Sequence, residues 1–332
     1  MAITRKRKLN TGASTNPNNE GNLDLISDLP THVIVHLLNR LPVREVVRTS
    51  ILSRKWRYYW VTVQHLDLGY YQLYQTLKEA FENEAKFKAN MFESLIYGSP
   101  LLQKLILVNC QGINHFKVSA PNLKSLHLKA NRELKTICFE NVPKLANVTI
   151  DTVGILVNHS MESSPLLEFL MSLPKLTQLS MNGDTLRQEL PTTVEGLKYL
   201  KLDSLDFTNF DEISCALCLI RNTPNLKALE IKVKRVHTKT TDSQPKWGYS
   251  EAEATFGCTL DRLRAVKIEF VRGSTPEVKL VKFLLANSPF LQNMSIIPVF
   301  PNGSPRYTAI LAMATELIRC YKASPGVVIT LG

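Results

Sequence analysis

One pair of cysteines, Cys215 and Cys218, has a spacing that could support chemistry. A Cys-x-x-Cys pair can hold zinc or act as a redox couple, but zinc requires further ligands and a redox pair requires a strand–helix context. No second pair lies nearby, and residues 213–220 form an apolar run with helical spacing. We therefore expect two core cysteines and no metal site.

The seven histidines also lack a catalytic or metal-binding pattern. His32 and His36 fall one helical turn apart without the glutamate of a His-Glu-x-x-His zinc motif, which favours two solvated positions. The chain contains no Gly-x-x-x-x-Gly-Lys phosphate loop and no Gly-x-Ser-x-Gly elbow, and only 14 of its 332 residues are glycine. We expect a protein that is not an enzyme and that uses no cofactor.

Positive charge is concentrated at the start of the chain. Of the formal net charge of +11, residues 1–60 contribute +6, from ten Lys/Arg against four Asp/Glu. This distribution argues against a basic groove along the rest of the chain. Residues 1–22 are too polar to fold. Their basic cluster fits a nuclear-import signal and a solvated tail equally well, and it consists of Arg5, Lys6, Arg7 and Lys8.

No feature of the sequence predicts secretion or membrane insertion. The basic N-terminus lacks an apolar core, and no apolar run approaches the roughly 18 residues that a membrane-spanning helix needs. The six cysteines are dispersed and imply no disulfide framework. We expect a reduced intracellular protein, nuclear and/or cytoplasmic.

Residues 23–68, the head, predict three short helices. Proline suits the first helical turn after Leu29, and the helix that follows has an apolar face of Val33, Ile34, Leu37, Leu38 and Leu41. Ser53 is the expected N-cap of the third helix, whose apolar face contains Trp56, Tyr59, Trp60 and Val63. At about 25 cal/mol per Å² of buried apolar area, so small a unit is marginally stable alone. Its surplus apolar surface predicts a docking module.

The head resembles the F-box. The resemblance rests on a run of anchors in matching order and spacing, which are Leu29, Pro30, Ile34, Leu38, Leu41, Pro42, Ser50, Leu52, Ser53, Trp56 and Arg57. The variant LSRKWRYYW resembles that of plant F-box proteins with leucine-rich repeats and a C-terminal FBD region. This family implies docking onto a Skp-family adaptor, which hangs from a cullin–RING ubiquitin ligase. The implied adaptor-binding residues are Leu29, Pro30, Ile34, Leu38, Leu41, Pro42, Val43, Val47, Ser50, Leu52, Ser53, Trp56 and Trp60.

From Leu102 onward a leucine-spaced pattern recurs. Its first copies, starting at Leu102 and Leu123, fit the Leu-x-x-Leu-x-Leu strand template of leucine-rich repeats. Eight copies start at intervals of 21, 22, 31, 21, 29, 37 and 28 residues. Prolines just before many strands block helix there, while residues 212–222 have helical spacing. The repeating unit is therefore predicted to be helix, turn and strand, with a second extended segment starting at Leu134 in one repeat.

This pattern leaves one side of the predicted parallel sheet open, which we call the inner face. Leucines of the Leu-x-Leu pairs point into the core, and the residues between and beside them point outward. The charge of this row is mixed, as suits protein recognition, although each position alone could simply be solvated. The target-binding candidates are Lys104, His127, Lys129, Tyr199, Lys201, Asp203, Glu230, Lys232, Lys267 and Glu269.

The predicted fold class is α/β: a three-helix F-box, then an irregular leucine-rich-repeat solenoid with parallel strands inside and helices outside, then a C-terminal α/β cap. The expected boundaries are a disordered basic tail at 1–22, the F-box at 23–68, a helical linker at 69–98, the solenoid at 99–276 and an FBD-like cap at 277–332. The repeat array is shorter than the family resemblance implies.

Three functions remain possible from the sequence. The first is a substrate-recognition subunit of a Skp–cullin–F-box ubiquitin ligase, which recruits an unknown target protein. The second is a binding scaffold outside any ligase, or a shortened form that sequesters the adaptor. Nucleic-acid binding is the least favoured, because the basic charge is not laid along the solenoid face.

Overall fold

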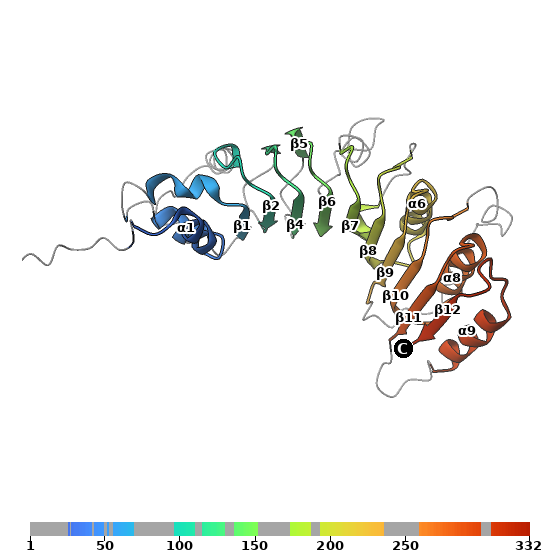
Figure 1. The fold of residues 1–332 in the computed structure, drawn as a ribbon. Coiled ribbons are helices and arrows are strands. Elements are labelled where there is room, and N and C mark those ends of the chain that lie inside the picture. The colour runs from blue at the N-terminus through green and yellow to red at the C-terminus, as the bar shows by residue number, and fades with distance from the viewer. Residues whose placement is uncertain are drawn as a thin grey trace, which may run out of the picture.

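The computed structural model describes residues 26, 28–41, 43–49, 52, 56–69, 96–109, 115–129, 136–151, 173–186, 193–235, 259–299 and 307–332. They form a mixed α/β structure in which one long row of strands runs from the head to the C-terminal helix α9 (Figure 1). The predicted basic cluster Arg5 to Lys8 and residues 70–95 of the predicted linker lie outside the described residues. None of the described helices is long and apolar enough to cross a membrane.

Within the described residues, ten strands make up the main sheet, and every neighbouring pair is parallel. Their order, β1-β2-β4-β6-β7-β8-β9-β10-β11-β12, follows the sequence without crossing. The strands are β1 (His65–Gly69), β2 (Lys104–Val108), β4 (Ser125–Lys129), β6 (Asn147–Asp151), β7 (Gln178–Asn182), β8 (Tyr199–Leu205), β9 (Ala228–Val233), β10 (Ala265–Val271), β11 (Asn293–Pro298) and β12 (Val328–Leu331). From β2 to β11 they start at the intervals that the leucine pattern predicts.

Alternation along each strand explains the core. In β4, for example, Leu126 and Leu128 are buried while His127 between them is half-buried. The parallel register places Leu126 beside Leu105 on one side and beside Val148 on the other. Two continuous apolar rows therefore run through the sheet and form a single core of buried residues from Leu66 to Leu317. The predicted core strands are confirmed.

Repeat length decides what covers the outer side of the sheet. The repeats of 28 and 29 residues accommodate α6 (Phe210–Arg221) and α8 (Thr275–Asn287), which lie on the same side of the strands (Figure 1). The shorter repeats near β2 and β4 instead contain β3 (His115–Ser119) and β5 (Thr136–Asn141), which pair as a small parallel sheet. A uniform helix–turn–strand unit was therefore a wrong prediction here, because repeats of 21 or 22 residues have no room for a three-turn helix. The second extended segment after Leu134 is confirmed as β5.

The head contains α1 (Thr31–Leu38), α2 (Val43–Arg48) and the 3-10 helix η2 (Trp56–Thr62). A small core of its own is made of Ile34, Leu38, Val46, Trp56 and Val63. The third predicted helix is a 3-10 turn in its described part. The Trp56 and Tyr59 rings meet edge to face with centroids 6.5 Å apart.

The C-terminal region continues the sheet. After β11, α9 (Tyr307–Arg319) buries Met313 and Leu317, and the short strand β12 adds to the edge of β11. Ser324 Oγ donates to the Leu291 carbonyl at 2.7 Å, and Lys282 forms an ion pair with Glu316 at 2.7 Å. These contacts tie the last helix and strand to the solenoid; its role as a cap stays a prediction.

Candidate functional site

The predicted docking residues of the head fall into two groups. Ile34, Leu38 and Trp56 are at most 4% exposed and lie in the head's own core. Trp56 also donates its indole N–H to the Ile26 carbonyl at 3.0 Å. These three side chains hold the helices together and shape the surface, and they offer little area to a partner.

The second group reaches the surface. Leu41 is 41% exposed and Leu52 is 51% exposed, and Pro30 is also exposed. Leu29 and Trp60 are half-buried and pack against the head core. Pro42, Ser50 and Ser53, together with the side chains of Val43 and Val47, lie outside the described residues.

Further large apolar side chains of the head are exposed, among them Ile26 at 46%. Leu37 is 43% exposed on α1, and Tyr58 is 69% exposed on η2. Helical spacing predicts Leu37 on the apolar face of its helix but does not assign it to a binding site, and Tyr58 lies outside the predicted apolar face of the third helix. Helical spacing identifies an apolar face, but it does not say which of its members a neighbouring helix covers.

The head is joined directly to the first strands of the sheet. Asn39 Oδ1 accepts the backbone N–H of Gln64 at 2.8 Å, which fixes the end of α1 to the chain just before β1. The Gln64 carbonyl in turn accepts the backbone N–H groups of Gln103 and Lys104, at 2.8 and 2.9 Å. A protein bound at the head would therefore have a defined position relative to the neighbouring repeats.

On the C-terminal half of the inner face, the predicted candidates form an alternating lattice of charges. Lys201 pairs with Glu230 at 3.2 Å, Lys232 pairs with Glu269 at 3.6 Å and with Asp203 at 3.8 Å, and Lys267 pairs with Glu269. The parallel register explains the pattern, because Lys201, Glu230 and Lys267 occupy one row across β8, β9 and β10. Three cations and three anions thus cancel, and this part of the face carries no net charge.

Tyr199 joins the same lattice. Its hydroxyl donates to Glu230 Oε2 at 2.7 Å, and burial together with this hydrogen bond raises the pKa of the phenol well above its usual range. Burial favours the neutral form of Glu230, but the hydrogen bonds from Tyr199 and Lys201 outweigh it and hold the pKa of this carboxyl below its ordinary value. Glu230 therefore stays ionised at neutral pH, which maintains the lattice.

The N-terminal half of the inner face is different. Lys104 and Lys129 are exposed, and His127 between them is half-buried. Burial lowers the pKa of His127; nearby Asp151 opposes this effect, and both lysines add to it. His127 is consequently neutral at physiological pH and can offer a hydrogen-bond donor and an acceptor beside two cations.

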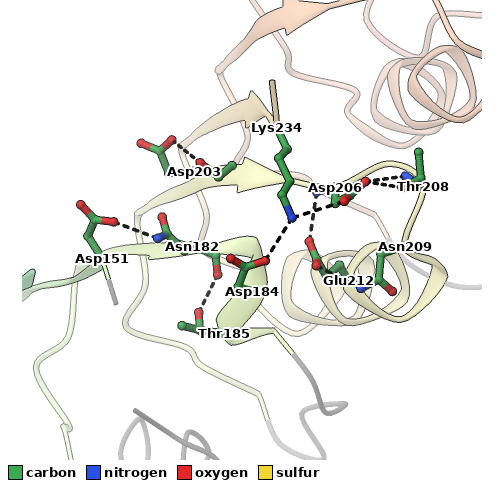
Figure 2. Close-up of polar contacts among 11 residues, drawn as sticks. Asp151, Asn182, Asp184, Thr185, Asp203, Asp206, Thr208, Asn209, Glu212 and Lys234 are labelled. Carbon is green, nitrogen blue, oxygen red and sulfur yellow. Dashed lines mark hydrogen bonds and ion pairs between the residues drawn. The ribbon is translucent and has the colours of Figure 1, made fainter. Parts of the chain in front are cut away.

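A second polar cluster, which the sequence analysis missed, lies where strands β7 to β9 end. Figure 2 shows Lys234 between Asp184 and Asp206, with Nζ–carboxylate distances of 3.5 and 3.4 Å. Glu212 in the first turn of α6 is buried and accepts the backbone N–H of Asp206 at 3.0 Å. Burial, reinforced by the charges of Asp184 and Asp206, raises the pKa of Glu212. The cluster connects three successive repeats and braces the strand ends.

No set of three or more His, Cys, Asp or Glu side chains within the described part of the chain could hold a metal ion. Cys215 is buried and Cys218 half-buried in α6, which agrees with the predicted core position of this pair. Within the described residues, the candidate binding surfaces are the head's exposed apolar side chains and the polar faces of the solenoid.

Comparisons with known proteins agree with this architecture. A family model described as FBD-associated F-box protein At5g56370, LRR repeats, matches residues 42–231, and the FBD model matches residues 254–296. The FBD match starts before residue 277, where the sequence analysis places the boundary.

Several Arabidopsis thaliana proteins are similar to the chain. The F-box/FBD/LRR-repeat protein At1g13570 is 26% identical over 414 residues, which cover 91% of this chain and 97% of that protein. The putative FBD-associated F-box protein At3g60710 is 25% identical over 287 residues, covering 81% and 82%. The first alignment is longer than the 332 residues of the chain, so the relative contains segments that this chain lacks. The shortening of the repeat array itself stays a prediction.

Proposed function

The chain belongs to the FBD-associated F-box proteins with leucine-rich repeats, and on this premise we propose that it is a substrate-recognition subunit of a Skp–cullin–F-box ubiquitin ligase. The head docks a Skp-family adaptor, and the solenoid recruits a target protein. The observation that carries the proposal is the exposure of Leu41 and Leu52 on a head whose anchors Ile34, Leu38 and Trp56 are buried.

Such a subunit works by placement, without chemistry of its own. The ligase subunits bound through the adaptor would transfer ubiquitin, and the solenoid would raise the local concentration of the target near them. The backbone hydrogen bonds from Gln103 and Lys104 to Gln64 support this role, because they fix the head to the repeats. A freely jointed head would hold a target much less precisely.

Energetics favour docking through the exposed leucines. The head core is small, and large apolar side chains beside it remain in contact with water. Burying a fully exposed leucine contributes about 1.5–3 kcal/mol, and each of the head's exposed leucines, exposed to 41–51%, can gain about half of that. Leu37, Leu41 and Leu52 together could therefore supply a large share of the adaptor affinity, while Trp56 would contribute by keeping them in place.

The inner face is the proposed target surface. Its C-terminal half is a neutral lattice, so a target would gain little from net charge there and would be selected by shape and by hydrogen bonds. The N-terminal half offers Lys104, His127 and Lys129 without an ion pair of their own among the described residues. This half is the more adaptable part of the proposed face.

The proposal is tested by co-purification of the full chain with a Skp-family adaptor. Leu41→Asp and Leu52→Asp should each weaken adaptor binding by about 30-fold or more, since a charge in an interface core costs about 2 kcal/mol or more. Leu311→Asp is the matched control, because Leu311 is 65% exposed on α9 at the other end of the molecule. Isothermal calorimetry with the purified adaptor gives the dissociation constants.

The buried anchor separates docking from folding. Trp56→Ala should also reduce adaptor binding, but with a loss of head structure that the two leucine variants do not show, because Trp56 lies in the head core. Undiminished adaptor binding by both Leu→Asp variants would refute the proposal. If the adaptor binds and removal of the chain changes the turnover of no protein, the adaptor-sequestering function replaces that of a substrate receptor.

A further inference from the structure

A hollow with a strongly basic lining lies along one edge of the solenoid. Its volume is about 820 Å³, and its lining contains six Lys/Arg and one Glu, a balance of +5. We call these six side chains the basic rim; all are exposed, and they are Lys124, Lys144, Lys175, Lys198, Lys227 and Arg262. The prediction that the body of the chain has no basic groove is therefore wrong.

The repeat itself builds the basic rim. Each strand is preceded by a tight turn, and two turn positions flank the buried leucine before the strand, as Asn122 and Lys124 flank Leu123. A basic residue occupies one of these two positions, or both, before every strand from β4 to β10 of the main sheet. Basic residues that are far apart in the sequence thus become neighbours at one edge of the sheet. A short segment of the sequence contains only one or two of them and does not reveal the cluster.

Backbone hydrogen bonds stack these positions in register. The N–H of Lys227 donates to the Lys198 carbonyl at 2.8 Å, and the N–H of Lys198 donates to the Thr177 carbonyl at 2.8 Å. The same ladder continues through Ala146 to Lys124. Successive rungs are therefore about 4.8 Å apart, the ordinary spacing of strands in a sheet.

Within the described residues, none of the six cations of the basic rim pairs with a carboxylate. Lys124 and Lys144 donate only to amide oxygens, those of Gln103 at 3.0 Å and Asn122 at 2.7 Å. On β8, β9 and β10 the inner face cancels its charges, whereas the basic rim accumulates one sign. Like charges at this spacing repel one another, and a bound polyanion relieves the repulsion.

We infer that the basic rim binds an extended acidic segment of a polypeptide, so that part of the target is held at the edge of the solenoid. That the acidic segment belongs to a target protein rests on the proposed function. The binding of an acidic peptide to the basic rim does not depend on it. The lining contains no aromatic side chain on which a nucleic-acid base could stack, and five of its six cations are lysines. Lysine is a point charge on a flexible stem without arginine's planar fork, so it attracts carboxylates without fixing their orientation.

The dimensions fit a short peptide. Five strand-to-strand steps separate β4 from β10, which at about 4.8 Å each span about 24 Å. An extended chain rises about 3.3 Å per residue, so about seven or eight residues cover the rim. The cations of the basic rim lie at turn positions either before or after the buried leucine. They can therefore face acidic side chains on both edges of such a segment.

The test uses the full chain and a fluorescently labelled peptide of eight glutamates, followed by fluorescence anisotropy at 50 and 200 mM salt. We expect saturable binding that weakens as salt rises. Lys198→Glu combined with Lys227→Glu, on consecutive rungs, should weaken binding at least tenfold. The double variant Lys198→Gln and Lys227→Gln removes the same two charges without adding negative ones. It should weaken peptide binding less than the Lys→Glu pair and should disturb the fold less.

The matched control is Lys279→Glu combined with Lys282→Glu, which makes the same change in charge on α8, a helix that covers the outer side of the sheet. Equal losses from both double variants would mean attraction to overall charge and would overturn the assignment to the rim. Tighter binding of an eight-residue oligodeoxythymidine than of the peptide would overturn the choice of ligand. Adaptor binding should be unchanged in all these variants, so failure here is distinguishable from failure of the head to dock.

Discussion

At the scale of single residues, Gly183 shows how closely the repeats approach one another. A Cβ at this position would lie 2.6 Å from Glu212 Oε2 and 2.9 Å from the Cα of Leu205. Glu212 cannot simply move away, since it accepts hydrogen bonds from the Asp206 backbone and from the Asn209 side chain, both at 3.0 Å. A side chain at position 183 would therefore push apart the turn after β7 and the end of β8.

This contact makes a prediction about stability. Gly183→Ala should lower the free energy of unfolding by about 1–3 kcal/mol, the usual cost of inserting a methyl group into a packed site. The matched control is Gly326→Ala, because no atom lies within 4 Å of a Cβ there. Urea denaturation of both variants measures the difference. Equal midpoints for the two would show that Glu212 relaxes without cost.

Residue types predicted much of the site but not its exposure. The buried anchors Ile34 and Trp56 and the exposed anchors Leu41 and Leu52 have the same apolar character in sequence, and only helix packing separates them. The ion-pair lattice was equally hidden. It exists because the parallel register brings Lys201 beside Glu230, which are 29 positions apart in the chain.

At the scale of elements, α6 and α8 begin in the same way. Each follows a strand that contains a residue in the left-handed region, Ser204 with φ of 55° and Phe270 with φ of 66°. Each also has a buried glutamate in its first turn, and in α8 Glu277 Oε2 accepts the backbone N–H groups of Ser274 at 2.8 Å and Arg272 at 3.0 Å. The glutamates satisfy donors that the turn between strand and helix would otherwise leave buried without partners.

The strand positions could be predicted because each repeat carries its own leucines, whose spacing does not depend on distant residues. The elements between the strands could be predicted only in part. Residues 212–222 have helical spacing and lie in a repeat long enough for α6. The leucine pattern does not predict that residues 115–119 pair with residues 136–141. These pairs form across a whole repeat, and the sequence of either segment alone does not determine them.

The capping glutamate of α8 gives a pH-dependent prediction. Burial raises the pKa of Glu277 above its ordinary 4.5, and the hydrogen bonds only partly offset it. At pH values between 4.5 and the higher folded-state pKa, the folded chain binds more protons at Glu277 than the unfolded chain does. The stability that this group contributes is therefore complete below pH 4.5 and is lost as pH rises through the folded-state pKa.

Glu277→Gln keeps an oxygen acceptor for both backbone donors and cannot ionise. As pH rises from 4.5 toward neutrality, the variant should therefore gain stability relative to the unmodified chain. Urea unfolding at a series of pH values measures this difference. A difference that stays constant with pH would show that Glu277 titrates alike in the folded and unfolded states.

At the scale of the whole molecule, the chain is a one-dimensional stack. The strands of the main sheet follow one another in sequence order and form one elongated row (Figure 1). The hydrophobic core runs along this row from repeat to repeat. The stability of such a stack is approximately a sum over neighbouring repeats. The head and the basic rim thus belong to regions that can unfold locally and independently. A destabilising substitution near one end of the stack need not destabilise the other end.

Hydrogen exchange tests this independence. Leu229 in β9 is 2% exposed and lies between Leu200 and Val266, so Leu229→Ala leaves a cavity that costs about 2–5 kcal/mol. Backbone amides of β8, β9 and β10 should exchange faster, while those of β2, β4 and β6 keep their protection. Leu126→Ala in β4, where Leu126 is 1% exposed, is the mirror-image control and should reverse the pattern. If amide exchange were equally faster in all the strands of both variants, the solenoid would unfold as one cooperative unit. Docking at the head would then respond to changes anywhere along the target-binding surface.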